Sequence, residues 1–495
     1  AFAEAVEAGT WAGWDDSWGG WQEPGWRHDD DGDWAVELEC LLAGLGRVFL
    51  AGDLDTAAKG YGRLLRILSD AESEGLLPPL HTGPELDWVE VGARWLRSVY
   101  ETSPAERRAR ALIEAIDGAR WVLPTLSLQA VIDARPAQVA DLEEFLDAWI
   151  AELSSRADSE PWALDLLIEA TMRRSGLAGL GLLAHRQAST QAAVWLAWVE
   201  TATTIGESRV AAEAAREGLD VLANGSERAR IAEHLARLAG PQDHDERLRA
   251  LVQAWRSAPT RARLLAVATA ARWAGRWDEM IDVLVDGLHD ESAATPSALL
   301  VAVVLVLAGR VDDAARLAPA GGDWTGRGHA GALVVPILLA VGAGAARAGE
   351  WRRTVLASLL ADLDAGPDWD DRSANPPADE VAFVPETVTL AGLLDAGIAD
   401  AQTTGADRDR WLVEGTAAVA DRIAVVVSNK HRKLYRHAAR LAVAGAEAVS
   451  IASGPKAGAD AIAAASVRFP RHVAYRDELA RAQRESPLLP APVRR

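Results

Sequence analysis

The sequence has a single cysteine, Cys40, which excludes an intramolecular disulfide framework and a zinc site built from cysteines. A lone thiol fits a reducing compartment best, so we expect a cytoplasmic protein. Alternating runs of Val, Ile, Thr and Tyr, which are typical of half-buried strands, are nearly absent. Ala, Leu, Arg and Glu dominate instead, and all four favour helices. The sequence therefore predicts an all-α chain.

Patterns that mark enzymes and metal sites are also scarce. The 10 histidines show no His-x3-His or His-Glu-x-x-His spacing, and no Gly-x-Ser-x-Gly nucleophile motif occurs. The glycine-rich stretch 176–181 lacks the Lys-Ser/Thr of a phosphate loop, so we interpret it as a helix break. The acidic run Asp29–Asp33 fails the spacing of a calcium loop, because Trp34 and Cys40 stand where Gly and Glu are needed. We expect no catalysis, no cofactor and no metal.

A short turn signal recurs along the chain. It combines Ala-Gly with a following polar residue at Ala51-Gly52-Asp53, Ala274-Gly275-Arg276, Ala308-Gly309-Arg310 and Ala348-Gly349-Glu350, with looser copies around Gly206 and Gly240. The glycines at 206, 240, 275 and 309 are spaced 34, 35 and 34 residues apart. Such a period is typical of stacked helix hairpins, since Gly ends one helix and a polar residue begins the next. We therefore predict an α-solenoid of stacked antiparallel helix hairpins, in which neighbours bury each other's apolar faces.

This turn, the step of 34 residues and a proline at the repeat boundary together resemble tetratricopeptide repeats. The resemblance covers residues 200–363 best, with further copies at 40–68 and 430–482. Trp277 and Trp351 stand where the family often has an aromatic residue. The resemblance implies a TPR-like superhelix whose curved surface binds peptides or protein partners.

A second resemblance concerns the stretch Tyr435–Leu479, which contains Arg468-Phe469-Pro470-Arg471-His472. It is similar to helical regions that accompany SWIM zinc fingers in bacterial proteins. The zinc finger itself cannot be present, because it needs several cysteines. This resemblance therefore implies further helices but no zinc site.

Composition divides the chain into four parts. We expect an acidic, Trp-rich segment at 1–34, a helical-repeat solenoid at 35–363, an acidic, Pro-rich loop at 364–380, and C-terminal helical repeats with a basic face at 381–495. The net charge of −21 is uneven, because residues 421–495 hold 14 Lys+Arg and 6 Asp+Glu. That end carries +8 and the remainder −29. An acidic body argues against nonspecific nucleic-acid binding by most of the surface.

The longest uncharged stretch runs from Ala330 to Ala346. It is short for a membrane span, contains Pro336, and lies where a repeat helix is due. We predict a buried repeat helix here and no association with a membrane.

Four tryptophans near the N-terminus, Trp11, Trp14, Trp18 and Trp21, step by 3, 4 and 3 residues, which would place them on one face of a helix. Acidic residues crowd between them. Two interpretations stay open: a terminal helix that docks on the first repeat, or an acidic–aromatic segment that binds a partner. The four tryptophans are candidate partner-binding residues.

The basic stretch near residue 430 is the sharpest charged feature. On a helix, Arg432, Lys433, Arg436 and Arg440 would fall near one face, just after Lys430. The face is either a solubilising surface, a dock for an acidic partner or a nucleic-acid contact. The acidic N-terminal segment is one candidate partner, which predicts self-association between the two ends of the chain.

These observations favour an intracellular interaction scaffold or adaptor. It would bind a protein or peptide partner through the solenoid surface and catalyse nothing. The first alternative is a nucleic-acid-binding protein that uses the basic C-terminal face. The second is an enzyme with a pocket between helices.

Overall fold

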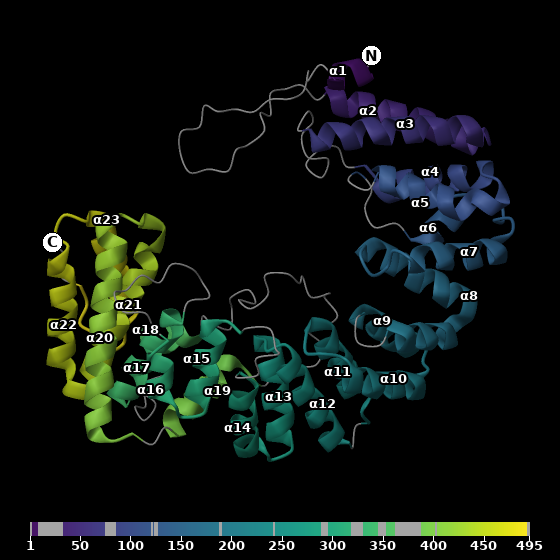
Figure 1. Ribbon diagram of the computed structural model, residues 1–495. Coiled ribbons are helices and arrows are strands. Elements are labelled where there is room, and N and C mark those ends of the chain that lie inside the picture. The colour runs from purple at the N-terminus through teal and green to yellow at the C-terminus, as the bar shows by residue number, and fades with distance from the viewer. Residues whose placement is uncertain are drawn as a thin grey trace. The chain divides into compact units, whose positions relative to one another are not determined.

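The computed structural model is built from helices packed on one another (Figure 1). It describes residues 2–7, 33–74, 86–119, 122, 127–187, 191–240, 243–288, 296–317, 330–344, 353–361, 388–400 and 403–492. Within these ranges lie 23 α-helices and two short 3-10 helices, and no strand occurs in them. Helices that follow one another along the chain pack together, so the predicted all-α, solenoid-like class is confirmed.

Contacts between helices divide the chain into two compact units, residues 1–198 and 199–495. The first unit holds α1 (Phe2–Glu7), α2 (Asp33–Leu50), α3 (Leu54–Ser73), α4 (Trp88–Thr102), η2 (Ala105–Arg107), α5 (Arg108–Ala119), α6 (Leu128–Asp133), α7 (Leu142–Ser154) and α8 (Pro161–Gln187). Helix α9 (Ala192–Thr204) begins in the first unit and ends in the second. The predicted division at 34, 363 and 380 stays a prediction.

The first unit opens with the helix hairpin that the sequence predicts. Helices α2 and α3 meet at Gly52, whose φ of 87° is left-handed, and Asp53 caps α3 by accepting a hydrogen bond from the Thr56 N–H (3.2 Å). Further along, α8 is interrupted at Gly176, where φ is 60°. The predicted helix break in the stretch 176–181 is therefore confirmed.

The second unit continues with shorter helices. It holds α10 (Ser208–Val221), α11 (Ser226–Leu238), α12 (His244–Ser257), α13 (Arg261–Trp273), α14 (Trp277–Gly287), α15 (Ala298–Leu307), α16 (Val311–Ala315), α17 (Gly331–Ala343), α18 (Val355–Ala361), α19 (Leu390–Asp400), α20 (Gly405–Ser428), η6 (Arg432–Leu434), α21 (Tyr435–Ser453), α22 (Pro455–Arg468) and α23 (Val473–Glu485). We call α9/α10, α11/α12, α13/α14 and α15/α16 the regular hairpins, and α17 to α23 the C-terminal cluster.

The regular hairpins share one kind of bend. Left-handed glycines stand at Gly206, Gly275 and Gly309, with φ between 66° and 86°. At the second of these, the Gly275 N–H donates to the Arg272 carbonyl (3.1 Å) and the Arg276 N–H donates to the Ala271 carbonyl (2.8 Å). This pair of hydrogen bonds is the Schellman motif, which satisfies carbonyls at the helix end. Gly240 also lies in a bend, without a left-handed φ, so all four periodic glycines fall between helices as predicted.

Arginine–glutamate pairs link successive regular hairpins. Arg230 of α11 donates to Glu200 of α9 (2.7 Å), and Arg263 of α13 donates to Glu233 of α11 (2.6 Å). Each arginine lies 30 residues after its partner, and the second pair lies 33 positions after the first. The same contact therefore recurs at two successive junctions between hairpins, as is expected where similar units stack.

The C-terminal cluster packs around one central helix. Helix α21 contacts α17, α18, α20, α22 and α23, and nearly every residue from Tyr435 to Ser450 is buried or half-buried. Helix α17, which lies within the uncharged stretch, is buried along almost its whole length, partly against α20. The predicted buried helix is confirmed, and none of the described helices has the length and apolar character needed to cross a bilayer.

Candidate partner-binding surface

The predicted basic residues surround the bend between α20 and α21. The Lys430 N–H donates to the Val427 carbonyl (3.2 Å), and the His431 N–H donates to the Val426 carbonyl (3.0 Å). These are the Schellman hydrogen bonds of the regular hairpins. Lys430 occupies the left-handed position, with φ of 57°, where the regular hairpins have glycine. A side chain at this position costs about 1 kcal/mol or more, because Cβ approaches the backbone.

Four of the five predicted basic residues share this bend. The side chains of Lys430, Arg432, Lys433 and Arg436 are exposed, and we call them the basic turn. Helix α21 begins only at Tyr435, so two of the four precede it on the 3-10 turn η6. They are grouped by the bend and not by one helical face, which corrects the predicted arrangement.

Arg440 lies elsewhere. Its side chain is half-buried, and its Nη2 donates to the hydroxyl of Ser358 on α18 (2.7 Å). Arg440 therefore holds two helices of the cluster together and does not extend the basic turn.

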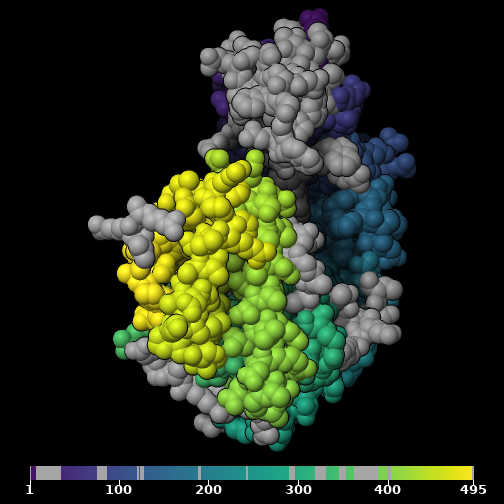
Figure 2. All heavy atoms as spheres, turned by 90° about the vertical axis from the view of Figure 1, so that its left-hand side faces the viewer, coloured from purple at the N-terminus to yellow at the C-terminus, as the bar shows by residue number. Residues whose placement is uncertain are grey.

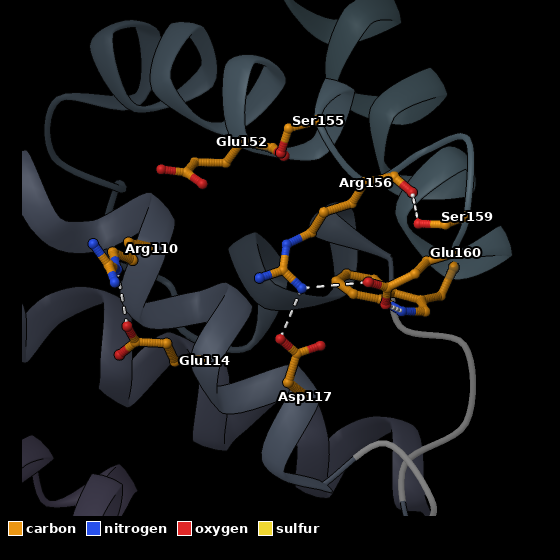
Figure 3. Close-up of polar contacts among 9 residues, drawn as sticks. Arg110, Glu114, Asp117, Glu152, Ser155, Arg156, Ser159 and Glu160 are labelled. Carbon is orange, nitrogen blue, oxygen red and sulfur yellow. Dashed lines mark hydrogen bonds and ion pairs between the residues drawn. The ribbon is translucent and has the colours of Figure 1, made fainter.

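The basic turn gathers four exposed cations that have no acidic partners in the described part of the chain. Within the described ranges, none of the four side chains of the basic turn forms an ion pair. Some arginines elsewhere are paired: in Figure 3, Arg156 reaches Asp117 (2.8 Å) and Glu160 (3.4 Å), and Arg110 pairs with Glu114 (3.0 Å). Unpaired exposed cations leave a local positive field that an anionic partner can neutralise.

An apolar groove lies among α20, α21 and α22, with a volume of about 380 Å³. Its lining follows helical spacing on each wall: Thr416, Val419, Ala420 and Ile423 from α20; Ala442, Gly445, Ala446 and Val449 from α21; and Ala461, Ala464, Ala465 and Arg468 from α22, with Phe469 beyond it. Figure 2 views the side where α20, in light green, and the yellow C-terminal helices face outward. We call this cavity the C-terminal groove.

One end of the C-terminal groove lies beside the basic turn. The Phe469 ring, which lines the groove, contacts the Tyr475 ring at 5.7 Å between centroids, and Tyr475 contacts Tyr435 at 6.0 Å. Tyr435 lies within the basic turn, between Lys433 and Arg436. At the same end, Arg468 Nη1 donates to the Ala420 carbonyl across the groove (3.2 Å). Tyr435 and Tyr475 are buried, so these rings connect the basic turn to the nearer end of the groove through the interior.

A second apolar groove, of about 450 Å³, lies among α1, α2 and α3 in the first unit. Arg63 is the one charged residue among those that line it, and Cys40 also contributes. In the described part of the chain, Arg47, Arg63 and Arg66 of α2 and α3 are also exposed and form no ion pair, whereas the basic turn gathers four such cations within seven residues. The C-terminal groove is therefore the stronger candidate for recognising a charged partner.

The cluster contains one buried carboxylate, Glu447 of α21. It accepts hydrogen bonds from the backbone N–H groups of Val355 (3.1 Å) and Leu356 (3.0 Å) and from the hydroxyl of Ser486 (2.7 Å). Burial raises the pKa of Glu447, while these three hydrogen bonds oppose the rise. The carboxylate caps α18 and ties the end of α23 to α21, which is a structural role.

The remaining predicted features fall outside the described ranges. These are Trp11, Trp14, Trp18 and Trp21, the acidic run Asp29–Asp33 except for the backbone of its last residue, the turn copy Ala348-Gly349-Glu350 with Trp351, and the acidic loop 364–380. In the ranges that are described, no three His, Cys, Asp or Glu side chains come together in a way that could hold a metal ion.

Sequence reasoning missed the C-terminal groove. Its signal was present, because α21 and α22 carry Ala and Gly at steps of three and four residues. Such a stripe is read first as buried packing between helices. That this stripe borders an open groove depends on which helices cover it, and local sequence does not specify that.

The fold and this surface define an all-α, solenoid-like protein with an apolar groove next to free positive charge. Comparison with known proteins finds no family model that matches the chain and no curated protein that matches it.

Proposed function

We propose that the protein is an intracellular, TPR-like interaction scaffold that binds a protein or peptide partner and catalyses nothing. The observation that carries this proposal is the C-terminal groove, an apolar channel that lies beside unpaired cations. A peptide site is expected to combine an apolar groove with polar groups at its rim.

The relation to tetratricopeptide repeats is part of this proposal. It is supported by the Schellman bends at three of the four periodic glycines and by the ion pair that recurs at two successive hairpin junctions. A cytoplasmic location is supported by the single, exposed thiol of Cys40, which a reducing compartment would keep free.

The absence of catalysis is supported by how the buried polar groups are used. Glu447 binds backbone N–H groups, and Arg97 of α4 donates to Glu101 (2.9 Å) and to the carbonyl of Ile132 (2.9 Å). Such contacts satisfy groups that burial would otherwise leave unpaired. Glu447 and Arg97 therefore have structural roles, because their polar atoms are used in hydrogen bonds within the protein.

A photo-crosslinking residue tests the proposal in the cells that make the protein. Placed at Ala464, which is exposed on the groove wall, it should join the chain to a defined protein partner. Placed at Ala463, which is exposed on the same helix but does not line the groove, it should give little of that adduct. Equal adducts, or none, at both positions would contradict a scaffold that binds through this groove.

A second candidate function is nucleic-acid binding through the basic turn, favoured by its four unpaired cations. Affinity for single- or double-stranded DNA or RNA should then fall steeply as salt rises. Lys433→Glu should weaken that binding about tenfold, whereas Arg249→Glu, an equal charge change at an exposed position of α12, should have little effect. Equal responses of the two variants would exclude a specific nucleic-acid contact at the turn.

Self-association is a further proposal for the same surface. Residues 8–32 contain 6 Asp+Glu and 1 Arg, which complements the +8 of residues 421–495. If the acidic end of one copy binds the basic end of another, sedimentation should show association at low salt that disappears at high salt. A single species at every protein concentration and salt would contradict it.

A further inference from the structure

We infer that the partner of the C-terminal groove is an amphipathic helix with acidic residues at its C-terminal end, lying antiparallel to α21. This inference rests on the proposed function and states the chemistry of its partner. It follows from three observations: the shape of the groove walls, the charge at its two ends and the backbone of Lys430.

The walls fit a helix. Each of the three helices contributes lining residues at positions i, i+3, i+4 and i+7, so each wall presents one helical stripe about 10 Å long, or two turns. The floor consists of Ala442, Gly445 and Ala446, which are buried and small. Small residues at a contact allow a second helix to approach closely, with its own side chains filling the space between the walls.

The two ends of the groove differ in charge. Because α20, α21 and α22 follow one another as antiparallel helices, the lining residues Ile423, Ala442 and Arg468 lie at the end near the basic turn. At the other end, the exposed acids Glu414 and Asp460 stand just before the first lining residues of α20 and α22. A helix with acidic residues at one end is therefore favoured in one direction only.

The helix dipole determines which end of the partner helix should carry the acidic residues. The C-terminus of a helix carries partial negative charge and is stabilised next to cations. Both effects add when the acidic residues stand at the C-terminal end of the partner and that end meets the basic turn. The partner then runs in the same direction as α20 and α22, as the next helix of a stacked solenoid would.

The backbone of Lys430 supports a role for the basic turn. The regular hairpins use glycine at the left-handed position of this bend, where it costs little. Lysine there costs stability and leaves the bend unchanged, so its charge is the property that distinguishes it from glycine. Strain of this kind concentrates at functional sites.

A displayed library of random 16-residue peptides, selected on the full-length chain, tests the inference. Enriched peptides should carry apolar residues at i, i+3, i+4 and i+7 and Asp or Glu after the last of them.

Ala464→Phe, which places a bulky ring at the exposed groove wall, should weaken the binding of these peptides at least tenfold. Ala463→Phe should bind as the original chain does, and circular dichroism checks that both variants fold. If Ala464→Phe does not fold, Ala461→Leu, which enlarges the same wall at a half-buried position, takes its place.

Direction is tested with the best selected peptide and a version whose acidic residues are moved to its N-terminal end. We expect the original to bind at least fivefold more tightly, and Lys433→Glu to remove that preference. If the groove variants weaken binding but both peptides bind equally, the stated direction is wrong. If binders ignore Ala464→Phe, the groove inference is wrong while a scaffold role at another surface stands. If the library yields no binder at all, both the inference and the proposed function fail.

Discussion

The regular hairpins and the C-terminal cluster use the same bend for different purposes. At Gly275 the left-handed residue has no side chain, and the neighbouring Arg276 is paired with Glu279 and Asp245. At Lys430 the left-handed residue carries a charge, and the basic turn around it is unpaired within the described residues. At this bend the regular hairpin thus uses its charge in internal contacts, whereas the cluster exposes four unpaired cations. That contrast favours the cluster as the proposed interaction surface.

The two regions also differ in how helices are covered. In the regular hairpins each helix packs mainly on the next one along the chain. In the cluster, α17 packs on α20 and α18 packs on α21, so helices separated in sequence surround a single centre. The central helix α21 therefore tolerates little change, while the outer side of the groove between α20 and α22 stays open.

The largest expected effect concerns Glu447, at the centre of the cluster. Glu447→Ala removes the acceptor of three hydrogen-bond donors, each costly to leave unsatisfied in the interior, so we expect a loss of about 3 kcal/mol or more. Chemical denaturation, followed through the unfolding transition of residues 199–495, measures this loss of stability. A loss below about 1 kcal/mol would mean that water replaces the carboxylate and that α18 is not held by it.

The pH dependence of Glu447 has a definite sign. Because burial raises its pKa above the ordinary value of 4.5, the folded state holds the proton more tightly than the unfolded state does. Stability from this group is present below pH 4.5 and is lost as pH rises from there through the raised pKa. Glu447→Gln cannot titrate, so the original chain should lose stability relative to this variant across that range. A difference that is constant with pH would contradict the raised pKa.

A close approach of helices gives the next effect. A Cβ added at Gly342 of α17 would lie 2.6 Å from the backbone nitrogen of Leu412 on α20, so Gly342→Ala should destabilise by about 1–3 kcal/mol. Gly405→Ala is the matched control, because a Cβ there, in the first turn of α20, meets nothing within 4 Å. The control should be neutral or slightly stabilising in thermal unfolding. Equal effects would show that α17 and α20 do not pack this closely.

Exchange of the two left-handed residues compares the regions directly. Gly275→Lys should cost about 1 kcal/mol, and Lys430→Gly should stabilise by about 0.5–1 kcal/mol, because only glycine adopts this backbone freely. Denaturation of the two single variants measures both changes. Effects of the same sign at the two positions would mean that the two bends are not equivalent.

The smallest effect is the coupling between Glu233 and Arg263, which join two regular hairpins at 2.6 Å. Both side chains are largely covered, so a double-mutant cycle to alanine should give about 0.5–1 kcal/mol. The exposed pair Arg110 and Glu114 within α5 should give no more than about 0.5 kcal/mol. Coupling that is equal in the two pairs would mean that the Glu233–Arg263 contact has no special role in stacking the hairpins.

The regular part of the fold could be predicted from sequence because its signals are local. Gly275 and Gly309 end helices through their own backbone, and the uncharged residues around Pro336 predict a buried helix without reference to any partner. The contact between Gly342 and Leu412 has no such signal, because it joins helices that lie far apart in the sequence. The bend at Lys430 has no such signal either, because a non-glycine residue gives no local sign that it takes a left-handed backbone.

The same distinction between local and long-range signals applies to the candidate site. The basic residues could be found by composition, whereas the groove beside them depends on how α20, α21 and α22 pack. The acidic, Trp-rich segment and the acidic loop are visible only as composition, and their predicted roles stay predictions.

The most direct test of the account measures stability and peptide affinity together in Lys430→Gly, with the acid-ended peptide selected on the original chain. We expect the variant to unfold at a higher denaturant concentration, because glycine removes the left-handed strain at residue 430. We expect it to bind this peptide at least threefold more weakly, because the lysine charge is lost. A variant that gains stability and binds the peptide unchanged would contradict the claim that the basic turn serves recognition.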